Sequence, residues 1–446
     1  MRLSNYQNST VFSKNVIKNG FVLSLTAVLL LGLSFKSNAG NSGDNSSEAS
    51  YSSLLSEAVD IYHAGNIVRA EKLFFRAKAM NPQQPAPYHH LASIQEHKIF
   101  TPLFFQNFEM NPKQVKEISA RYETMISLIS MNGSEKEFYP ELKLNHLWGS
   151  LALSYNVRGK SDSAAWALEE GKNRGAFTSS SLEYGRNILA SADENAIIVG
   201  RISDTYSLYY LQMIEGLRKD VTVIDYNMMS SVTYIEDFLQ QQNGATAKCR
   251  SIQLQRSKQL KNYNLDTFRS RDLTLAMNNG EQIQWTLKPT SFGFRLHQRD
   301  YMLLNLIAEN SGNRPFYFLM NNFNEKNVLW LDEYISNEGL LYKLVSSKDK
   351  SGINSASILN LFNNEWNMDD ALSSDENLSL HDYYYSSYLI PVMKSIESEL
   401  AADQHSKART LFTQLNERMN PAKHPYPEYL MKPYKNINSE LSTARK

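Results

Sequence analysis

A regular spacing of small and large residues between Tyr51 and Pro82 restricts most strongly what this chain can fold into. Small side chains let two antiparallel helices approach closely, a glycine between them permits a tight turn, and a proline ends the second helix. A phenylalanine in the second helix fills the groove between the two. The residues at these positions are Gly65, Ala70, Phe74, Ala77 and Pro82. The sequence therefore predicts a helical hairpin over this segment.

The spacing resembles a tetratricopeptide repeat, whose unit is about 34 residues long. A second window, which opens at Asn145, fits the same pattern through Trp148, Tyr155, Gly159 and Ala164. Because one repeat cannot bury its apolar face alone, we expect residues 85–144 to supply further helices. The sequence thus predicts a tetratricopeptide-like helical domain over 51–178. Such a stack either holds another chain in its groove or supports the rest of the molecule, and the sequence leaves both open.

The N-terminus has the order of a secretory signal peptide. Basic residues come first, an apolar run follows from Gly20 to Phe35, and small residues precede Gly40. We predict a signal peptide over 1–39 that is cut after Ala39, then a flexible spacer over 40–50. The alternative is an uncleaved anchor, although the run would reach only about 24 Å of a core roughly 30 Å thick. The expected location is the periplasm or the medium outside the cell.

Composition excludes several classes of function. The chain has 46 basic and 46 acidic residues, so it offers no basic excess for nucleic acid. After residue 36 no apolar run is long enough to cross a membrane, so no membrane span is expected in the mature chain. Cys249 is the one cysteine and cannot form an intramolecular disulfide.

The pattern changes after residue 178 to that of an α/β domain, expected over 179–346. Apolar β-branched runs at 195–199 and 221–225 flank an apolar helix at 206–217, which predicts a βαβ unit with parallel strands. Further strands are expected at 273–277, 282–287, 315–319 and 340–345. A helical segment is expected over 347–446. The predicted fold is thus multidomain α and α/β, with tetratricopeptide-like helical hairpins, an α/β domain with a βαβ unit, and a C-terminal helical segment.

Three blocks within residues 190–345 resemble the soluble C-terminal region of bacterial membrane proteins related to protein O-mannosyltransferases. The first block is Ala196 to Ile235, which contains Asp204-Thr205-Tyr206. The second is Asp300 to Asn310 followed by Arg314-Pro315-Phe316, and the third runs from Leu331 to Leu340. Arg201 and Ile202 depart from that pattern, since they stand where the family has Gly and Asp. The membrane-embedded part that would carry glycosyl transfer is absent. The resemblance therefore implies an accessory domain of unknown function and no transferase.

Polar side chains at the ends of the first two predicted strands form the one candidate ligand site. In open α/β sheets ligands gather at the carboxyl ends of the strands. The candidate residues are Arg201, Asp204, Thr205, Asp225 and Asn227. Two structural interpretations compete: Asp204 as a helix cap, and Asp225 as the end of a strand. Tyr206, Tyr209 and Tyr210 fit either stacking on sugar rings or a helix core.

No catalytic, cofactor or metal motif is present, so the sequence predicts no catalytic residue, no cofactor and no metal site. We expect an exported interaction or scaffold protein that binds a protein partner in the cell envelope through its helical repeats. The alternative is glycan recognition, or an accessory role in envelope glycosylation, through the α/β domain.

Overall fold

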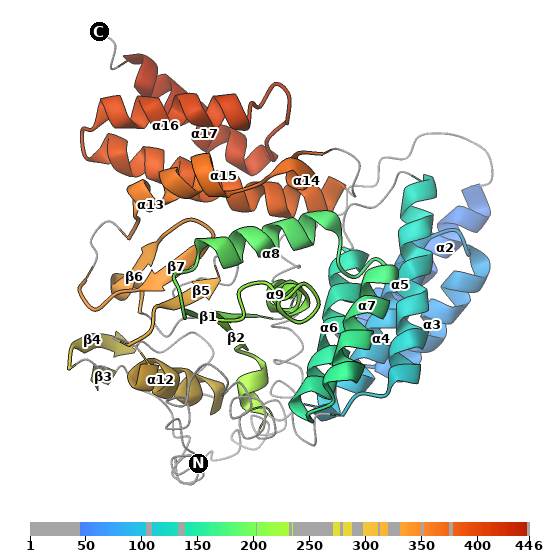
Figure 1. Cartoon of the computed structure of the whole chain (residues 1–446). Coiled ribbons are helices and arrows are strands. Elements are labelled where there is room, and N and C mark those ends of the chain that lie inside the picture. The colour runs from blue at the N-terminus through green and yellow to red at the C-terminus, as the bar shows by residue number, and fades with distance from the viewer. Residues whose placement is uncertain are drawn as a thin grey trace, which may run out of the picture. The chain divides into compact units, whose positions relative to one another are not determined.

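The computed structural model describes residues 45–103, 109–132, 139–201, 203–231, 234, 271–276, 280–287, 298–310, 313–319, 331–348, 352–373 and 378–443 (Figure 1). They fall into two compact units, one within Met1–Pro102 and Ala120–Ser134, the other within Leu103–Ser119 and Glu135–Lys446. The predicted signal peptide, its cleavage site and Cys249 lie outside the described residues. The first described helix begins at Asn45 and so takes in the second half of the predicted spacer.

The first unit opens with the predicted helical hairpin. Helix α2 (Asn45–His63) and helix α3 (Ile67–Met80) are joined by a turn in which Gly65 has φ +82°. A side chain with a Cβ would be strained at this φ, which explains the glycine. Asn66 then caps α3, because its side-chain oxygen accepts a hydrogen bond from the Arg69 amide at 3.3 Å. Pro82 lies just beyond the end of α3 and is exposed.

The core of this unit lies where α2 and α3 meet helix α4 (Pro85–Leu103). It consists of Ala58, Ala70, Leu73, Phe74, Leu91 and Ile94, with Ala77 also fully buried. The His90 ring of α4 stacks on Phe74 with the ring centres 4.4 Å apart. The part of helix α5 (Pro112–Asn132) that belongs to this unit buries Tyr122 completely. The helices expected between the two repeat windows are therefore present as α4 and α5.

The second unit contains the other predicted hairpin, formed by α6 (Pro140–Val157) and α7 (Ser161–Asn173). Gly159 turns the chain with φ +69°, and Ala164 is fully buried. Trp148 is also fully buried, and its indole nitrogen donates a hydrogen bond to the Ser119 hydroxyl at 2.9 Å. A Cβ at Gly171 would lie 2.7 Å from the Trp148 Cβ, so the small residue lets the two helices nest. Tyr155 is half-buried on the same helix.

A mixed five-stranded sheet follows helix α8 (Ser179–Ser191). Strand β1 (Ile197–Gly200), helix α9 (Ser203–Met213) and strand β2 (Thr222–Asp225) form the predicted βαβ unit, and the two strands pair in parallel. The strand order is β2-β1-β5-β7-β6, with β5 (Phe316–Leu319) parallel to β1. Strands β6 (Ile335–Asn337) and β7 (Leu341–Leu344) are antiparallel additions. The sequence did not predict β6.

The remaining elements of this unit lie outside that sheet. Strands β3 (Arg271–Ala276) and β4 (Gln282–Leu287) form a separate antiparallel hairpin, and α12 (Gln298–Asn310) follows it. The C-terminal segment is helical, as predicted, with α13 (Ser355–Asn360), α14 (Asp369–Leu372), α15 (Leu378–Ala401), α16 (His405–Arg418) and α17 (Glu428–Thr443). In the described part of the chain no helix combines the length and the apolar character needed to cross a membrane.

The C-terminal segment is attached to α8. The Glu183 carboxylate of α8 accepts hydrogen bonds from the backbone amides of Asp370 and Ala371, at 2.8 and 3.0 Å. These amides belong to the first turn of α14, where a carboxylate satisfies donors that have no partner within the helix. The second unit thus takes in described residues from all three predicted domains.

Candidate functional site

The carboxyl ends of β1 and β2 meet at one edge of the sheet, because Gly200 pairs in register with Asp225. The five predicted site residues follow these ends directly, so the structure brings their backbones to the same edge. Their side chains have different environments. Asp204, Thr205 and Asp225 are buried, whereas Arg201 and Asn227 are half-buried.

Asp225 has a structural role at this edge. Its side chain is fully buried, and its Oδ1 accepts hydrogen bonds from the amides of Asn227 and Met228, at 2.8 and 3.4 Å. These amides open the short helix η1 (Met228–Ser230). Asp225 therefore ends the strand and shapes the turn that follows it.

Asp204 lies in the first turn of α9 and is 7% exposed. Its Oδ1 accepts a hydrogen bond from the Tyr383 hydroxyl of α15 at 2.9 Å. Burial and the Asp204 charge raise the pKa of the Tyr383 phenol, which keeps this donor protonated. Asp204 thus links the βαβ unit to the C-terminal helices.

We expect Asp204→Ala to lower the free energy of unfolding by about 1–3 kcal/mol, because the hydroxyl of the half-buried Tyr383 then loses an acceptor. Asp204→Asn retains an acceptor oxygen at this position, so its free energy of unfolding should fall by less. Urea unfolding followed by circular dichroism measures both changes. Equal losses for the two variants would contradict a role through this hydrogen bond.

Two arginines lie against the ring of Tyr226, the residue that follows β2. The guanidinium carbon of Arg201 is 4.9 Å from the ring centre, and that of Arg299 in α12 is 5.1 Å from it. Arg299 also donates a hydrogen bond to the Asn227 side-chain oxygen at 3.3 Å. The Tyr226 hydroxyl donates to Asp300, which is buried. Sequence reasoning found Arg201 and Asn227 but missed Tyr226, Arg299 and Asp300.

This cluster combines positively charged hydrogen-bond donors with the face of an aromatic ring. Burial lowers the pKa of Arg201, but a guanidinium stays charged at neutral pH. Burial also raises the pKa of the Tyr226 phenol, so it does not act as a base near neutrality. Arg201 makes no hydrogen bond or ion pair to a residue that the structure describes. Its guanidinium donors are therefore available to an acceptor at this edge.

Helix α9 is held by close contacts at glycines of its neighbours. A Cβ at Gly149 of α6 would lie 2.2 Å from the Tyr206 ring, and one at Gly185 of α8 would lie 2.9 Å from Leu211. The Tyr206 hydroxyl is 2.9 Å from the Ser150 hydroxyl, and its side chain is 1% exposed. Tyr206 and Tyr210 are thus core residues, while Tyr209 is half-buried.

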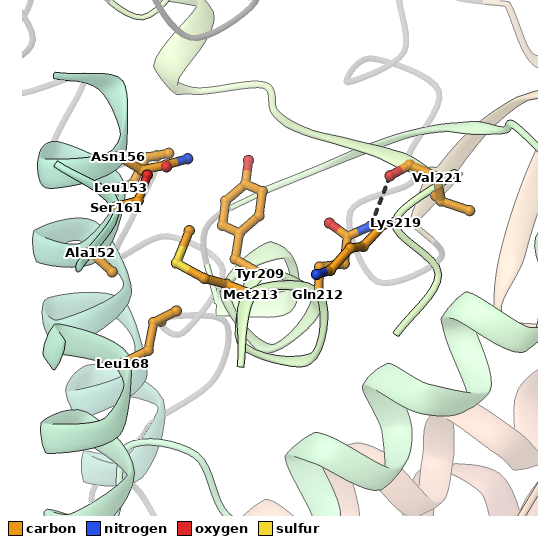
Figure 2. Close-up of a pocket in the computed structure, with 10 residues that line it drawn as sticks. All are labelled: Ala152, Leu153, Asn156, Ser161, Leu168, Tyr209, Gln212, Met213, Lys219 and Val221. Carbon is orange, nitrogen blue, oxygen red and sulfur yellow. Dashed lines mark hydrogen bonds between the residues drawn. The ribbon is translucent and has the colours of Figure 1, made fainter. Parts of the chain in front are cut away.

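Tyr209 lies in a pocket between the α6–α7 hairpin and α9 with the segment that leads into β2. The pocket has a volume of about 350 Å³. Figure 2 shows Asn156 and Ser161 on one side, Tyr209 and Met213 in the middle, and Gln212 with Lys219 on the other side. Ala152, Leu153, Leu168 and Val221 complete the lining. No local sequence pattern indicates this pocket, because its two walls come from separate predicted domains.

His146 of α6 is buried beside α9 and should make stability depend on pH. Burial and the nearby Lys143 lower the pKa of His146 to about 3, and its ring stacks on Tyr206. The unfolded chain therefore binds a proton near pH 6.5 that the folded chain does not bind until about pH 3. The stability that the neutral ring contributes is present above pH 6.5 and is lost as the pH falls below it.

Between pH 6.5 and 4 the free energy of unfolding should fall with decreasing pH. In His146→Phe this slope should be smaller by up to about 1.4 kcal/mol per pH unit. The measurement is urea unfolding at a series of pH values. His405→Phe, at the start of α16, serves as the control. An unchanged slope in His146→Phe would contradict a neutral buried imidazole.

Within the described residues no group of three or more His, Cys, Asp or Glu side chains could hold a metal ion. The buried carboxylates at the sheet edge accept hydrogen bonds from backbone amides and from a tyrosine hydroxyl.

Comparison with known proteins agrees with the α/β part of the sequence analysis. Residues 181–269 and 267–362 match the family model described as TMEM260-associated domain 2. This is a domain of unknown function related to TMEM260, an O-mannosyltransferase-like protein. The matched residues run from α8 through the sheet to just beyond α13, and they include Arg201, Tyr226 and Arg299. No curated protein and no solved structure matches the chain. The α/β part of this chain is thus similar to a domain associated with O-mannosyltransferase-like proteins.

Proposed function

We propose that this chain is an exported, non-catalytic interaction protein of the cell envelope whose tetratricopeptide-like hairpins bind a partner protein. The observation that carries the proposal is the surface of α3. One side of this helix is buried, yet Val68, Phe75 and Met80 remain 67%, 46% and 46% exposed. Exposed large apolar side chains gathered on one element mark surfaces that meet another molecule.

The charges of α3 indicate the chemistry of the partner. The helix carries Arg69, Lys72, Arg76 and Lys78 against one acidic residue, Glu71, which pairs with Lys98 of α4 at 2.8 Å. Lys72 and Arg76 are exposed and have no ion pair to a described residue. The Arg121 guanidinium carbon lies 5.7 Å from the Phe75 ring centre, which adds positive charge beside the apolar side chain. The partner segment is therefore acidic and carries apolar side chains.

A defined peptide tests this proposal. We expect the full chain to bind a fluorescent peptide of alternating Glu and Leu, as measured by anisotropy, and to bind the Lys and Leu version far more weakly. Lys72→Glu with Arg76→Glu should weaken binding of the acidic peptide by roughly ten-fold or more, because two attractive charges become repulsive. Lys432→Glu with Lys435→Glu, at two exposed positions of α17, is the matched control.

The result that would overturn the proposal is equal binding of the two peptides, or no effect of reversing the charges on α3. Binding to vesicles with anionic lipid, but to neither peptide, would assign the surface to a membrane instead.

A second candidate function is glycan recognition at the carboxyl edge of the sheet. The Arg201 guanidinium favours it, because it has no hydrogen bond or ion pair to a described residue. This donor group could bind sugar hydroxyls or an acidic sugar. Arg201→Met keeps an apolar side chain of similar length while it removes the donors. If the function is correct, binding on a glycan array is lost in Arg201→Met and kept in Arg186→Met, an exposed arginine of α8 that pairs with Glu215. Unchanged binding of Arg201→Met to the glycan array would contradict this candidate function.

A further inference from the structure

The pocket of Figure 2 has the size and the lining of a small-molecule site. Its volume of about 350 Å³ equals the space of roughly a dozen water molecules, at about 30 Å³ each. Ligand pockets begin at about this size and combine apolar walls with a few polar groups. Here Leu153, Leu168 and Met213 provide the apolar part, and the half-buried Tyr209 ring lies beside them.

Some polar groups of the lining are already used, and others are available. The Gln212 amide donates to the backbone oxygens of Arg218 and Val221, at 2.9 and 2.8 Å, so it helps to build the wall. The Tyr209 hydroxyl donates to the backbone oxygen of Val223 at 3.3 Å. In contrast, the side chains of Asn156, Ser161 and Lys219 have no hydrogen bond to any residue within the described part of the chain.

The charge of the pocket comes from Lys219, since none of the ten lining residues is acidic. The acidic residues near Lys219 in sequence are engaged elsewhere. Glu215 pairs with Arg186 at 2.8 Å, and Asp220 pairs with Arg218 at 2.9 Å. The Lys219 ammonium is therefore not neutralised by either of them and is open to an anion at the rim.

We propose that this pocket binds a small organic anion. Its apolar or aromatic body lies against Met213, Leu168 and the Tyr209 ring, and its carboxylate or phosphate group meets Lys219. Acceptor groups at its other end meet Asn156 and Ser161 across the pocket (Figure 2). Because the two walls come from the α6–α7 hairpin and from α9 with the segment before β2, the bound anion also joins these elements. This site is separate from the α3 surface and does not depend on the function proposed for it.

Three probes of one shape test the proposal on the full chain: phenylacetate, phenyl phosphate and the neutral phenylacetamide. Saturation-transfer NMR measures binding, and thermal unfolding measures stabilisation by the bound probe. We expect the anions to bind and the amide to bind about five-fold more weakly. This factor corresponds to about 1 kcal/mol, the contribution of one partly exposed charge pair. A preference between the two anions identifies the ligand group as carboxylate or phosphate.

Two variants place the binding in this pocket. Lys219→Met keeps the apolar stem of an exposed side chain but removes its charge. It should weaken the binding of both anions about five-fold and leave the binding of the amide unchanged. Met213→Trp should fill the pocket and block all three probes. The matched control is Lys435→Met, an exposed lysine of α17. Equal binding of anion and amide, unchanged binding in Lys219→Met, or no signal from any probe would each overturn the proposal.

Discussion

Gly149→Val is expected to lower the free energy of unfolding of the second unit by about 3 kcal/mol. A Cβ at this position would lie 2.2 and 2.5 Å from two carbons of the Tyr206 side chain, so α6 and α9 would have to separate. Overpacking of this kind usually costs about 1–3 kcal/mol, and the β-branched valine places additional atoms in the same space. Denaturant unfolding followed by tryptophan fluorescence reports the change, since Trp148 is the neighbouring residue.

Gly149→Ala separates this clash from helix propensity. In a free helix alanine is favoured over glycine by about 1 kcal/mol. A net loss of stability in Gly149→Ala therefore identifies the contact with Tyr206. In a Tyr206→Ala background the same substitution should reduce the free energy of unfolding only slightly or should increase it. If Gly149→Ala stabilised the otherwise unchanged chain, α9 would not be held as the structure describes.

The second large effect is expected at Phe74, which is fully buried between α2, α3 and α4. Phe74→Ala removes the ring that fills the groove of the first hairpin and should cost about 3–5 kcal/mol. The neighbouring Phe75 is 46% exposed and provides a matched control, because Phe75→Ala should cost less than about 1 kcal/mol. Hydrogen exchange of peptides from α2, α3 and α4 measures both changes. Equal protection losses in the two variants would contradict this packing of the hairpin.

Local patterns in the sequence were sufficient for most individual elements. The hairpins at α2–α3 and α6–α7 follow from glycines and alanines at regular intervals, and β1, α9 and β2 follow from apolar runs of the right length. The strand β6 was missed because three residues are too short to show a period. The position of β5 beside β1 depends on a pairing between residues more than a hundred positions apart, which no local pattern encodes.

The candidate site was predictable only where one segment determines it. Arg201 and Asn227 follow their strands directly, so the rule for carboxyl ends of parallel strands found them. The partner of Asp204 is Tyr383, and the second arginine at Tyr226 is Arg299. Both come from helices far along the chain, where nothing in the local sequence marks them. The pocket of Figure 2 was missed for the same reason, since α7 and α9 meet only in the folded chain.

A photo-crosslinking amino acid placed at position 75 of the full chain, in cells that make it, tests the interaction most directly. The same crosslinker at position 429 is the control, because Tyr429 is an aromatic residue that is 62% exposed on the C-terminal helices. The account predicts a protein adduct at position 75 alone, with the attached residue in an acidic segment of the partner, and its loss when Lys72 and Arg76 are replaced by Glu. Equal adducts at both positions, or an adduct at position 75 that survives these replacements, would contradict it.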